Sequence, residues 1–584
     1  MTISASPASP NIVQRPLPAE WQLSGIPATL QRIYAARGVT RDDELQLTLK
    51  SLLPYHAMKG LDAALTLLVD AMQQQQRVLV VGDFDADGAT STAVAIRALR
   101  MMGLQQIDYL VPNRFDFGYG LTPELVDVAV QQRPDLILTV DNGIAANAGV
   151  AAAQAHGIKV LVTDHHLPGD ELPDAEAIVN PNQPGCAFES KAACGCAVVF
   201  YLMLALKTRL ASIGFFAKQQ ISEPNLLDLL DLVALATVAD VVPLDYNNRI
   251  LVEQGLRRIR AGRCQPGIRA LLEVAGRDPL RVVSTDFGFV VGPRLNAAGR
   301  LDDMSMGIEC LLTDNPSIAV QIATELDGMN RDRRQIEAGM AQDAERTLKS
   351  LTSALDQTTD YPAGVCLYQA DWHQGVIGIL ASRVKEKIYR PVIAFAQADN
   401  GELKGSARSI PGLHMRDALD LVFKRQPGLI KKFGGHAMAA GLTLVEDGFD
   451  TFRQAFAEVC EELLEPGSLQ EQIEVDGELA SEDYTLELAE TLRWASPWGQ
   501  GFPEPCFSGE FELVQQRIVG EKHLKLVVQP KGTGLLLDAI CFNVDPALWP
   551  SPKTAAQLVF QLDVNEFRGN RSVQLLVRKI FIMG

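Results

Sequence analysis

The sequence predicts an α/β protein of three parts: a doubly wound domain on a parallel sheet, a long helix leading to a smaller α/β domain, and a C-terminal antiparallel β-barrel. Three observations carry this prediction. Short Val/Leu/Ile runs alternate with helical stretches over residues 77–182. A long charged stretch with helical spacing follows. The chain from about Phe507 alternates polar and apolar residues, as strands with one buried face do.

The first region contains five apolar runs that we expect to be strands. Continuous runs of this kind are typical of parallel strands buried on both faces. The segments between them are long enough for crossover helices, which gives a doubly wound domain. Two apolar helices are expected after the strands, at 197–210 and 226–238. The strands are RVLVVGD (77–83), IDYLVP (107–112), LILTVD (136–141), IKVLVTD (158–164) and AIVNP (177–181).

The charged stretch at 316–355 predicts a single long helix between domains. Its apolar residues recur at spacings of three, four and seven, which places them on one helical face; they are Ile322, Leu326, Met329, Ile336 and Met340. A second α/β region is expected at about 361–459. An acidic segment then leads into the tail, where HLKLVVQ, LVFQLDVNEF and RSVQLLVRKIF predict short barrel strands.

A chain of 584 residues has room for three or four domains at roughly 150 residues each. We expect an N-terminal extension at 1–70 that packs on the first α/β domain, which itself spans 71–315. The connecting helix spans 316–357. The second α/β domain covers 358–460, and an acidic linker with the barrel covers 461–584.

The net charge of −18 argues, taken alone, against a nucleic-acid partner, because phosphate binding needs a basic surface. The charge is unevenly distributed, however. Residues 446–490 hold fifteen acidic side chains and one basic, whereas 249–300, 372–432 and 515–584 are each net positive. The total charge therefore does not exclude DNA. We expect the basic stretches to lie along a nucleic-acid path and the acidic segment to face away from it.

Nine cysteines, with no CxxC pair, indicate a reduced cytoplasmic protein. Cys186, Cys194 and Cys196 lie close together, but their spacing matches no common zinc motif and favours buried thiols. No signal peptide is evident, and the apolar runs are shorter than a membrane span, so no membrane association is expected.

Acidic residues cluster directly after the first predicted strand, where GDFDADG carries Asp83, Asp85 and Asp87. Ligands of open parallel sheets bind beyond the carboxyl ends of the strands, so this is the expected edge for chemistry. Three carboxylates in five residues also repel one another unless a cation lies between them. The alternative is a solvated loop that caps the next helix.

The same pattern recurs further along the chain, which favours a metal site. Neighbouring parallel strands bring their carboxyl ends together, so these side chains are expected to converge with the first aspartates. Carboxylates and imidazole without thiolate suit Mn²⁺ or Mg²⁺ better than structural zinc, and the pattern predicts two ions that activate water for attack on phosphorus. The additional residues are Asp141 in VDNG, Asp164, His165 and His166 in TDHH, and Asp240 in ATVADVVPL.

These four strings, in this order, resemble the successive motifs of the DHH phosphoesterase superfamily. The resemblance is strongest to its bacterial single-strand-specific DNA exonucleases and runs from about Arg77 to the C-terminus. It implies a catalytic DHH domain, a connecting helix, a DHHA1 domain and an oligonucleotide-binding (OB) barrel.

The resemblance also implies a ligand set. Asp85 and Asp141 would hold one ion, and Asp141 would bridge to the second. His166 would lie near the scissile phosphate. Relatives that hydrolyse pyrophosphate carry a histidine where Val81 and Gly82 stand here, so the ligands of the first ion are the open part. The second ion would have Asp87, Asp141, His165 and Asp240, with Asp83 and Asp164 as ligands or as residues that orient them.

Two further regions resemble the family's phosphate-binding motifs. GPRLNAAGRLDD (292–303) carries Arg294, Asn296 and Arg300, which would face the metals; by itself the string also suits a surface turn with exposed arginines. GSARS (405–409) and FGGHAMAAG (433–441) lie in the second α/β region, where Ser406 could instead form a turn and Arg408 a surface ion pair. The residues expected to grip DNA and its 5′ phosphate are Arg114, Ser406, Arg408, Gly434, Gly435 and His436.

The resulting hypothesis is a metal-dependent 5′-to-3′ exonuclease that degrades single-stranded DNA to 5′-mononucleotides in recombination and repair. Polarity and strand preference come from the resemblance, whereas the spacing of residues supports only phosphoester hydrolysis. Single-stranded DNA is the expected partner, the resemblance adds single-strand-binding protein and repair helicases, and we expect a monomer. The alternatives are a DHH phosphodiesterase for short oligonucleotides, cyclic dinucleotides or pyrophosphate, and a non-enzymatic scaffold.

Overall fold

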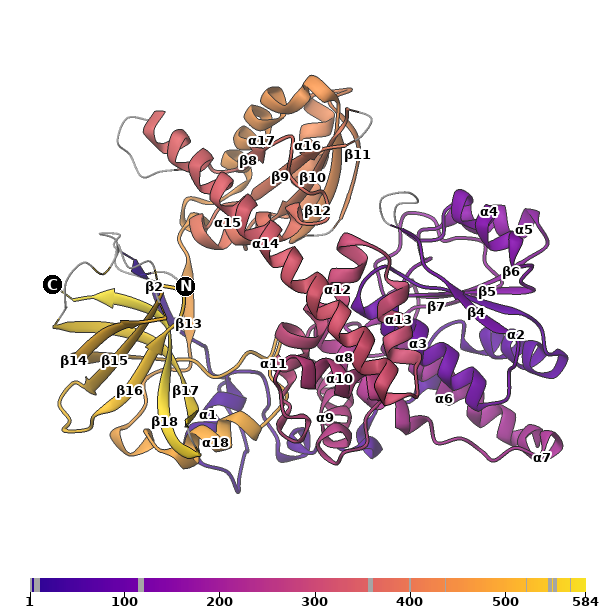
Figure 1. Cartoon of the computed structure of the whole chain (residues 1–584), viewed down its shortest axis with the longest axis horizontal. Helices are drawn as coiled ribbons and strands as arrows, with labels where there is room; N and C mark the ends of the chain where they lie inside the picture. Colours follow the sequence, from indigo (N-terminus) through magenta and orange to yellow (C-terminus); the bar gives the residue numbers. More distant parts are fainter. Residues whose placement is uncertain are drawn as a thin grey trace.

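The computed structural model describes most of the chain, and Figure 1 shows its arrangement. The described residues are 3–4, 11–113, 120–354, 361–398, 401–435, 437–520, 522–544, 549, 554–567 and 569–583.

The first α/β domain is built on a five-stranded parallel sheet of order β4-β3-β5-β6-β7. Alternate residues of β3 enter different cores: Val78 and Val80 join the core on one face of the sheet, and Leu79 and Val81 the core on the other. Helices therefore cover both faces, as the sequence predicts, with α2, α3 and α6 on one side and α4 and α5 on the other (Figure 1). The strands are β3 (Val78–Val81), β4 (Ile107–Leu110), β5 (Leu136–Val140), β6 (Lys159–Thr163) and β7 (Ala177–Val179).

The helices around this sheet carry the structural core. On length and composition alone, α6 could cross a membrane, but two thirds of it is buried inside the fold, which identifies it as a core helix. The helices are α2 (Leu61–Gln74), α3 (Ala86–Met101), α4 (Pro123–Gln131), α5 (Asn147–Ala155), α6 (Gly195–Ser212), α8 (Leu230–Ala239), α9 (Tyr246–Arg260), α10 (Pro266–Val274), α12 (Gly292–Leu301) and α13 (Ser305–Leu312).

The connecting helix α14 runs from Pro316 to Ala354 and joins the two α/β domains. Its N-terminal half packs on α10, α12 and α13, and its C-terminal half on α15. The second domain has a mixed sheet of order β11-β12-β10-β9-β8, in which only β8 and β9 are parallel. Its elements are β8 (Val365–Tyr368), α15 (Ile377–Ile388), β9 (Val392–Gln397), β10 (Leu403–Arg408), α16 (Met415–Arg425), β11 (Ile430–Gly435), β12 (Ala439–Leu444) and α17 (Phe449–Leu463).

The C-terminal strands close into a five-stranded barrel, because β17 pairs with both β14 and β18. Phe507, Phe511 and Phe560 fill its interior and are almost fully buried, whereas Phe542 is 37% exposed. This confirms the expected antiparallel barrel, although β16 and β18 pair in parallel. The strands are β14 (Phe507–Val519), β15 (His523–Pro530), β16 (Leu537–Cys541), β17 (Ala555–Phe567) and β18 (Asn570–Ile582).

The N-terminal extension contacts more than the first domain. Strand β2 (Asn11–Gln14) pairs in parallel with β13 (Gln472–Val475) of the acidic linker. Arg37, after helix α1 (Ala28–Ala35), donates 2.6 and 3.0 Å hydrogen bonds to the buried Asp476. The backbone of Leu53 also donates to Asn247 of the first domain. The extension thus connects the linker to the first domain. This long-range pairing could not be predicted from the local sequence of either segment.

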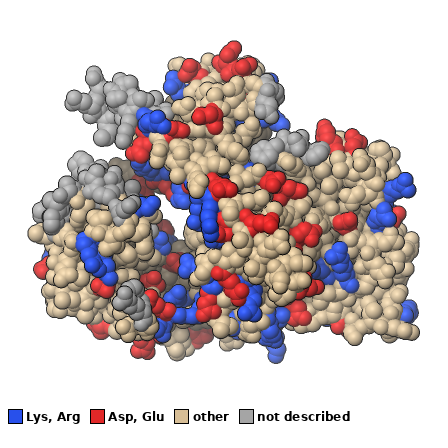
Figure 2. All heavy atoms as spheres, in the orientation of Figure 1, with Lys and Arg blue, Asp and Glu red and all other residues tan. Residues whose placement is uncertain are grey.

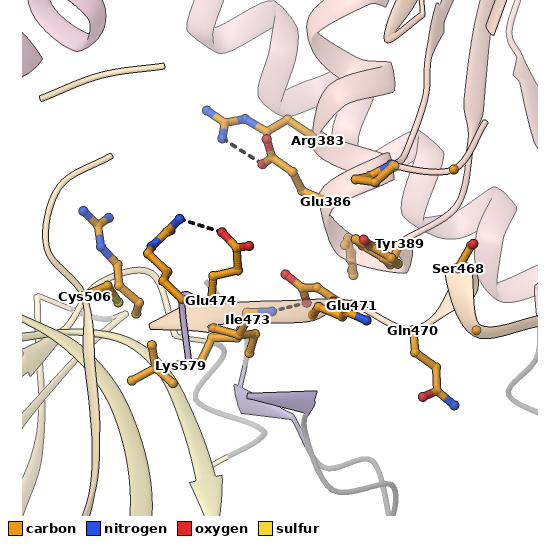
Figure 3. Close-up of a pocket in the computed structure, with 18 of the residues that line it drawn as sticks. Arg383, Glu386, Tyr389, Ser468, Gln470, Glu471, Ile473, Glu474, Cys506 and Lys579 are labelled. Atoms are coloured by element: carbon orange, nitrogen blue, oxygen red, sulfur yellow. Dashed lines mark hydrogen bonds and ion pairs between the residues drawn. The ribbon is translucent and has the colours of Figure 1, made fainter. Parts of the chain in front are cut away.

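The acidic linker forms ion pairs with several basic side chains of the barrel and the N-terminal extension. Glu471 pairs with Lys579 and Glu474 with Arg15, at the edge of a cavity of about 1260 Å³ between the second domain and the barrel (Figure 3). Arg571 pairs with Glu490 of α18 (Leu486–Trp494) at 2.5 Å. Some of the basic side chains that were expected to face DNA therefore form ion pairs with carboxylates of the protein itself. In the space-filling view, Lys and Arg also edge an opening between the barrel and the rest of the molecule (Figure 2).

Candidate active site

The predicted carboxylates and histidines converge at one edge of the parallel sheet. The strand order places β3 and β5 side by side, and the helices that follow them, α3 and α5, cover opposite faces. Between two such strands an open sheet leaves a crevice at its carboxyl edge. The loops after β3, β5 and β6 and the C-terminal end of α8 all reach this crevice.

The distances are those of a metal-binding cluster. The Nε2 atom of His165 lies 3.1 Å from Asp141 Oδ1, 3.4 Å from Asp240 Oδ2 and 3.8 Å from Asp87 Oδ2. Three groups have ligand atoms within 4.8 Å of one another: Asp83, Asp85 and Asp141; Asp87, His165 and Asp240; and Asp141, His165 and His166. Among the described residues, no such group includes a cysteine, and Cys194 and Cys196 are buried thiols, as expected.

Asp87 is held by the start of helix α6. Its two carboxylate oxygens accept hydrogen bonds from the backbone N–H groups of Gly195 (2.7 Å) and Cys196 (2.9 Å). Gly195 is required at this point, because a Cβ atom there would lie 2.6 Å from the Cβ of Asp141. The N-terminal end of α6 also stabilises negative charge through its dipole. Sequence reasoning did not identify this backbone contribution, although a glycine between two buried cysteines was visible.

Local backbone structure fixes the positions of Asp85 and Asp141 in the loops after β3 and β5. Asp85 caps helix α3 and accepts from the N–H groups of Asp87 and Gly88, so the capping alternative is also fulfilled, by one of the three aspartates. Asp141 has a φ of 61°, a left-handed conformation that costs energy for a residue other than glycine. The buried Asn142 donates 2.9 Å hydrogen bonds to Val81 O and Val140 O and holds the ends of β3 and β5 together.

The cluster carries more negative charge than its surroundings can balance. Burial and then repulsion from Asp85 raise the pKa of Asp87 to about 6. Burial and then repulsion from Asp87 and Asp85 also raise the pKa values of Asp141 and Asp240 well above the usual range. Buried carboxylates that repel one another are stabilised by a cation between them. With oxygen and imidazole donors only, the residues fit a hard divalent cation.

Asp164 and His166 form a separate pair beside the cluster. Asp164 Oδ1 lies 2.8 Å from His166 Nδ1 and also accepts from the N–H groups of His165 and His166. Although burial opposes it, this pairing raises the pKa of His166 to about 9 and keeps that of Asp164 below its usual value. His166 is therefore mainly protonated at neutral pH.

Helix α12 presses the motif 292–303 onto the first aspartate loop. Gly299 permits this contact, because a Cβ there would lie 1.9 Å from Phe84 O. Asn296 Oδ1 accepts a 2.7 Å hydrogen bond from Ala86 N, which fixes the start of α3. Arg294 is buried and donates to Asp327 of α14 and to Val290 O, so its partners lie inside the protein where a phosphate was expected.

Arg300 connects the site to the second domain. It donates a 3.1 Å hydrogen bond to Gly375 O, and a Cβ on Gly375 would lie 2.3 Å from Arg300 O. Three residues further, Gly378 lies in the first turn of α15. Its missing side chain leaves room for Arg408 Nη2 and Ser406 Oγ, each 2.9 Å from where a Cβ would stand.

Arg408 lacks the surface ion pair that was the alternative expectation. It donates to Ser406 Oγ (3.1 Å) and Ala407 O (2.8 Å), and no carboxylate of the described residues pairs with it. Burial lowers the pKa of its guanidinium. Gly434 and Gly435 end β11 on the far edge of the same sheet. Arg114 and His436 lie outside the described residues.

Comparison with known proteins places this architecture in a family. The chain is 56% identical to the single-stranded-DNA-specific exonuclease RecJ of Dickeya dadantii, over 96% of this chain and 98% of that protein. It is 55% identical to the protein of the same name from Escherichia coli, over 97% of both. The chain belongs to the RecJ family. Within it, family models match residues 77–237 (DHH family, N-terminal domain), 362–462 (DHHA1 domain) and 475–579 (RecJ OB domain).

Solved RecJ structures share the fold. The Mn²⁺ complex of RecJ from Thermus thermophilus superposes with a TM-score of 0.77 at 28% identity, over 97% of this chain and 80% of that one. A second structure, of exonuclease RecJ bound to manganese, is 33% identical with a TM-score of 0.58, over 71% of this chain and 97% of that one. These matches confirm the α/β domains and the OB barrel predicted from the sequence.

Proposed function

We propose that this chain is a metal-dependent exonuclease that degrades single-stranded DNA from the 5′ end to 5′-mononucleotides. The observation that carries the proposal is the buried carboxylate and histidine cluster at the crevice of the first sheet. Membership of a family whose named members are single-stranded-DNA-specific exonucleases supplies the substrate class. The barrel favours a long strand over a dinucleotide, because OB folds are surfaces for single strands.

The cluster would hold two divalent ions, Mn²⁺ or Mg²⁺, the metals in the solved relatives. Asp83, Asp85 and Asp141 would bind one ion and Asp87, His165 and Asp240 the other, with Asp141 between them. Ions bound in this way activate water for attack on phosphorus and offset the charge that develops on the phosphate oxygens.

The chain's own residues would orient the scissile phosphate. His166, fixed through Nδ1 by Asp164, would interact with a phosphate oxygen. Asn296 and Arg300 would keep the aspartate loop and the second domain in register, since they bond to Ala86 N and Gly375 O. We assign Arg294 to the same positioning role through Asp327.

The 5′ phosphate would bind at Ser406 and Arg408, at the start of α15. A half-buried guanidinium without a carboxylate partner among the described residues, next to a helix N-terminus, suits a terminal phosphate. Arg114 and the GGH string of Gly434, Gly435 and His436 are further proposed contacts, carried by sequence resemblance. Because the phosphate would be bound apart from the metals, only the end of a strand could satisfy both sites, which would set the polarity.

The remaining proposals concern the cellular setting. We propose a cytoplasmic monomer that serves recombination and repair, with single-strand-binding protein and repair helicases as partners. We also propose the domain limits given above, with the extension at 1–70 as a strap between the first domain and the linker.

A labelled oligonucleotide tests the activity directly. The protein is incubated with Mn²⁺ and single strands labelled at either the 5′ or the 3′ end, with a duplex and a dinucleotide in parallel. We expect labelled mononucleotides at once from the 5′-labelled strand and only after complete digestion from the 3′-labelled one. Release from the 3′ end first would reject the polarity, and a faster rate on the dinucleotide would favour a small-substrate phosphodiesterase.

A further inference from the structure

Three apolar side chains of the first domain are highly exposed to solvent, and two of them directly follow residues of the metal-binding cluster in the sequence. Among the large apolar residues of the described chain, Phe289 (75% exposed), Leu167 (61%) and Val241 (61%) are the most exposed. Isolated exposed apolar residues are ordinary, but a group of them at a functional site indicates contact with a ligand.

Two of the three adjoin the cluster in the sequence, and the third lies on a turn that packs on the helix carrying Asp240. Leu167 follows His166, and Val241 follows Asp240. Consecutive Cα atoms are only about 3.8 Å apart, so the backbone of both residues flanks the cluster, in the loop after β6 and at the end of α8 respectively. Phe289 lies in the π-helical turn η6 (Phe287–Val291), which packs on α8 just before Asp240. A Cβ on Gly292 would be 3.2 Å from the Cβ of Ala239.

Val241 holds its exposed position at a conformational cost. Its φ is 60°, and a β-branched residue in the left-handed region is a strained exception. The chain is fixed there by a hydrogen bond from Val241 N to Val238 O and by one from Leu244 N to Gln500 O. Strain that turns an apolar side chain toward solvent beside a buried acidic cluster indicates a role for that side chain.

Phe289 also lines a cleft in which other aromatic and basic side chains lie. This cleft of about 580 Å³ lies between the first domain on one side and the barrel with the segment before it on the other, where Trp494 is 38% exposed. The guanidinium of Arg260 lies 4.8 Å from the Trp494 ring centre in the same cleft. Aromatic rings beside arginines are the pattern to which unpaired bases and their phosphates bind.

We infer that Leu167, Val241 and Phe289 form an apolar rim that contacts the unpaired nucleobases next to the scissile phosphate. The inference rests on the proposed function and adds a base contact to it. A polyphosphate has no apolar group to place there. In a duplex the base faces are stacked and unavailable, so the rim would select unpaired nucleotides of any sequence.

The test compares cleavage of two single strands, one with all its bases and one that lacks the bases at its 5′ end. One 5′-phosphorylated single strand is normal, and a second carries tetrahydrofuran abasic residues at its first three positions. With Mn²⁺, wild-type kcat/KM should fall about tenfold or more on the abasic strand, and Phe289→Ala should lower it about fivefold on the normal strand only. Equal slowing of both strands, or of neither, would overturn the inference.

Two further variants separate the rim from folding effects. Val241→Gly removes both the side chain and the strain, so we expect an equal or higher Tm together with slower cleavage of the normal strand. Leu280→Ala is the matched control, because Leu280 is 60% exposed but neighbours no residue of the cluster; it should change neither rate. If it slows cleavage as much as Phe289→Ala, exposure alone explains the effect and the rim is rejected.

Binding distinguishes failure of the rim from failure of the proposed function. Fluorescence anisotropy with Ca²⁺ measures the affinity for both strands without requiring hydrolysis. A preference for the normal strand that Phe289→Ala abolishes supports the rim even if no cleavage occurs. Cleavage of both strands at one rate, with equal affinities, rejects the rim and leaves the exonuclease proposal standing.

Discussion

The two α/β domains face each other with opposite unbalanced charges. The first gathers carboxylates whose burial, and then whose mutual repulsion, raise the pKa values of Asp87, Asp141 and Asp240. The second holds the half-buried Arg408, whose guanidinium pKa is lowered by this desolvation and which has no carboxylate partner among the described residues. Each domain alone bears the cost of a buried charge. Bound metal ions would offset the charge of the first domain, and the 5′ phosphate of the substrate would offset that of the second.

A short chain of contacts joins these two regions. Asn296 bonds to the aspartate loop, and Arg300, four residues later on α12, bonds to Gly375 of the second domain. Gly378, one turn further, makes room for Arg408. The spacing between the cation and anion sites is therefore set by one helix and one loop, and not by the long helix α14 alone.

The largest effect should come from the residue shared by the two proposed ions. Asp141→Ala should reduce hydrolysis by about 10³-fold or more, because it removes the bridging ligand. The fold should persist, and the Tm of the metal-free protein should not fall, since a repelling carboxylate is lost. Asp108→Ala, an exposed position on β4, serves as the control. Wild-type activity in Asp141→Ala would reject the bridging role.

The second prediction concerns pH and metal. Because the pKa of Asp87 is about 6 in the folded protein, the folded state retains this proton where the unfolded state has released it. Stability of the metal-free protein should therefore fall as the pH rises from about 4, the value in the unfolded chain, to a little above 6, by up to about 3 kcal/mol from this group, and it should be flat at higher pH.

Differential scanning fluorimetry in EDTA between about pH 4 and pH 8 measures this loss. Mn²⁺ should restore the Tm at pH 8 and have less effect at pH 5, where protons compete for the ligands. Asp87→Asn should flatten the pH dependence in EDTA. A Tm that rises steadily from pH 5 to pH 8 in EDTA, with no difference in the Asn variant, would contradict the raised pKa of Asp87 in the metal-free protein.

The third prediction addresses the cationic side of the contrast. Arg408→Ala should lower kcat/KM on a 5′-phosphorylated strand by about 10- to 50-fold, the loss expected for one charged phosphate contact. The rate on a 5′-hydroxyl strand should change little. Arg408→Lys should restore only part of the rate, because it keeps the charge without the planar fork. Arg416→Ala, exposed on α16, is the control; equal losses on both strands would remove Arg408 from the phosphate site.

The two regions also show what the sequence could predict. Asp83 to Asp87, Asp141, His165 and Asp240 stand at ends of elements recognisable from local patterns, and parallel topology brings such ends together. The partners of these residues could not be predicted in this way. Binding of Asp87 by α6 depends on backbone groups 108 and 109 positions away, and the partner of Arg294 is in another helix. Nor does local periodicity show that β2 pairs with β13.

The smallest effect is expected in the acidic linker, because basic side chains of the barrel and of the N-terminal extension balance part of its charge. Glu471 and Glu474 already pair with Lys579 and Arg15, and exposed pairs of this kind contribute about 0–1 kcal/mol each. The double variant Glu471→Gln and Glu474→Gln should therefore change the affinity for single-stranded DNA by less than about twofold at moderate salt. Lys579→Ala removes the basic partner of the Glu471 pair instead of its acidic one. Anisotropy titrations at two salt concentrations measure both, and a tenfold change in either would place the linker on the DNA path and remove the contrast between balanced and unbalanced charge.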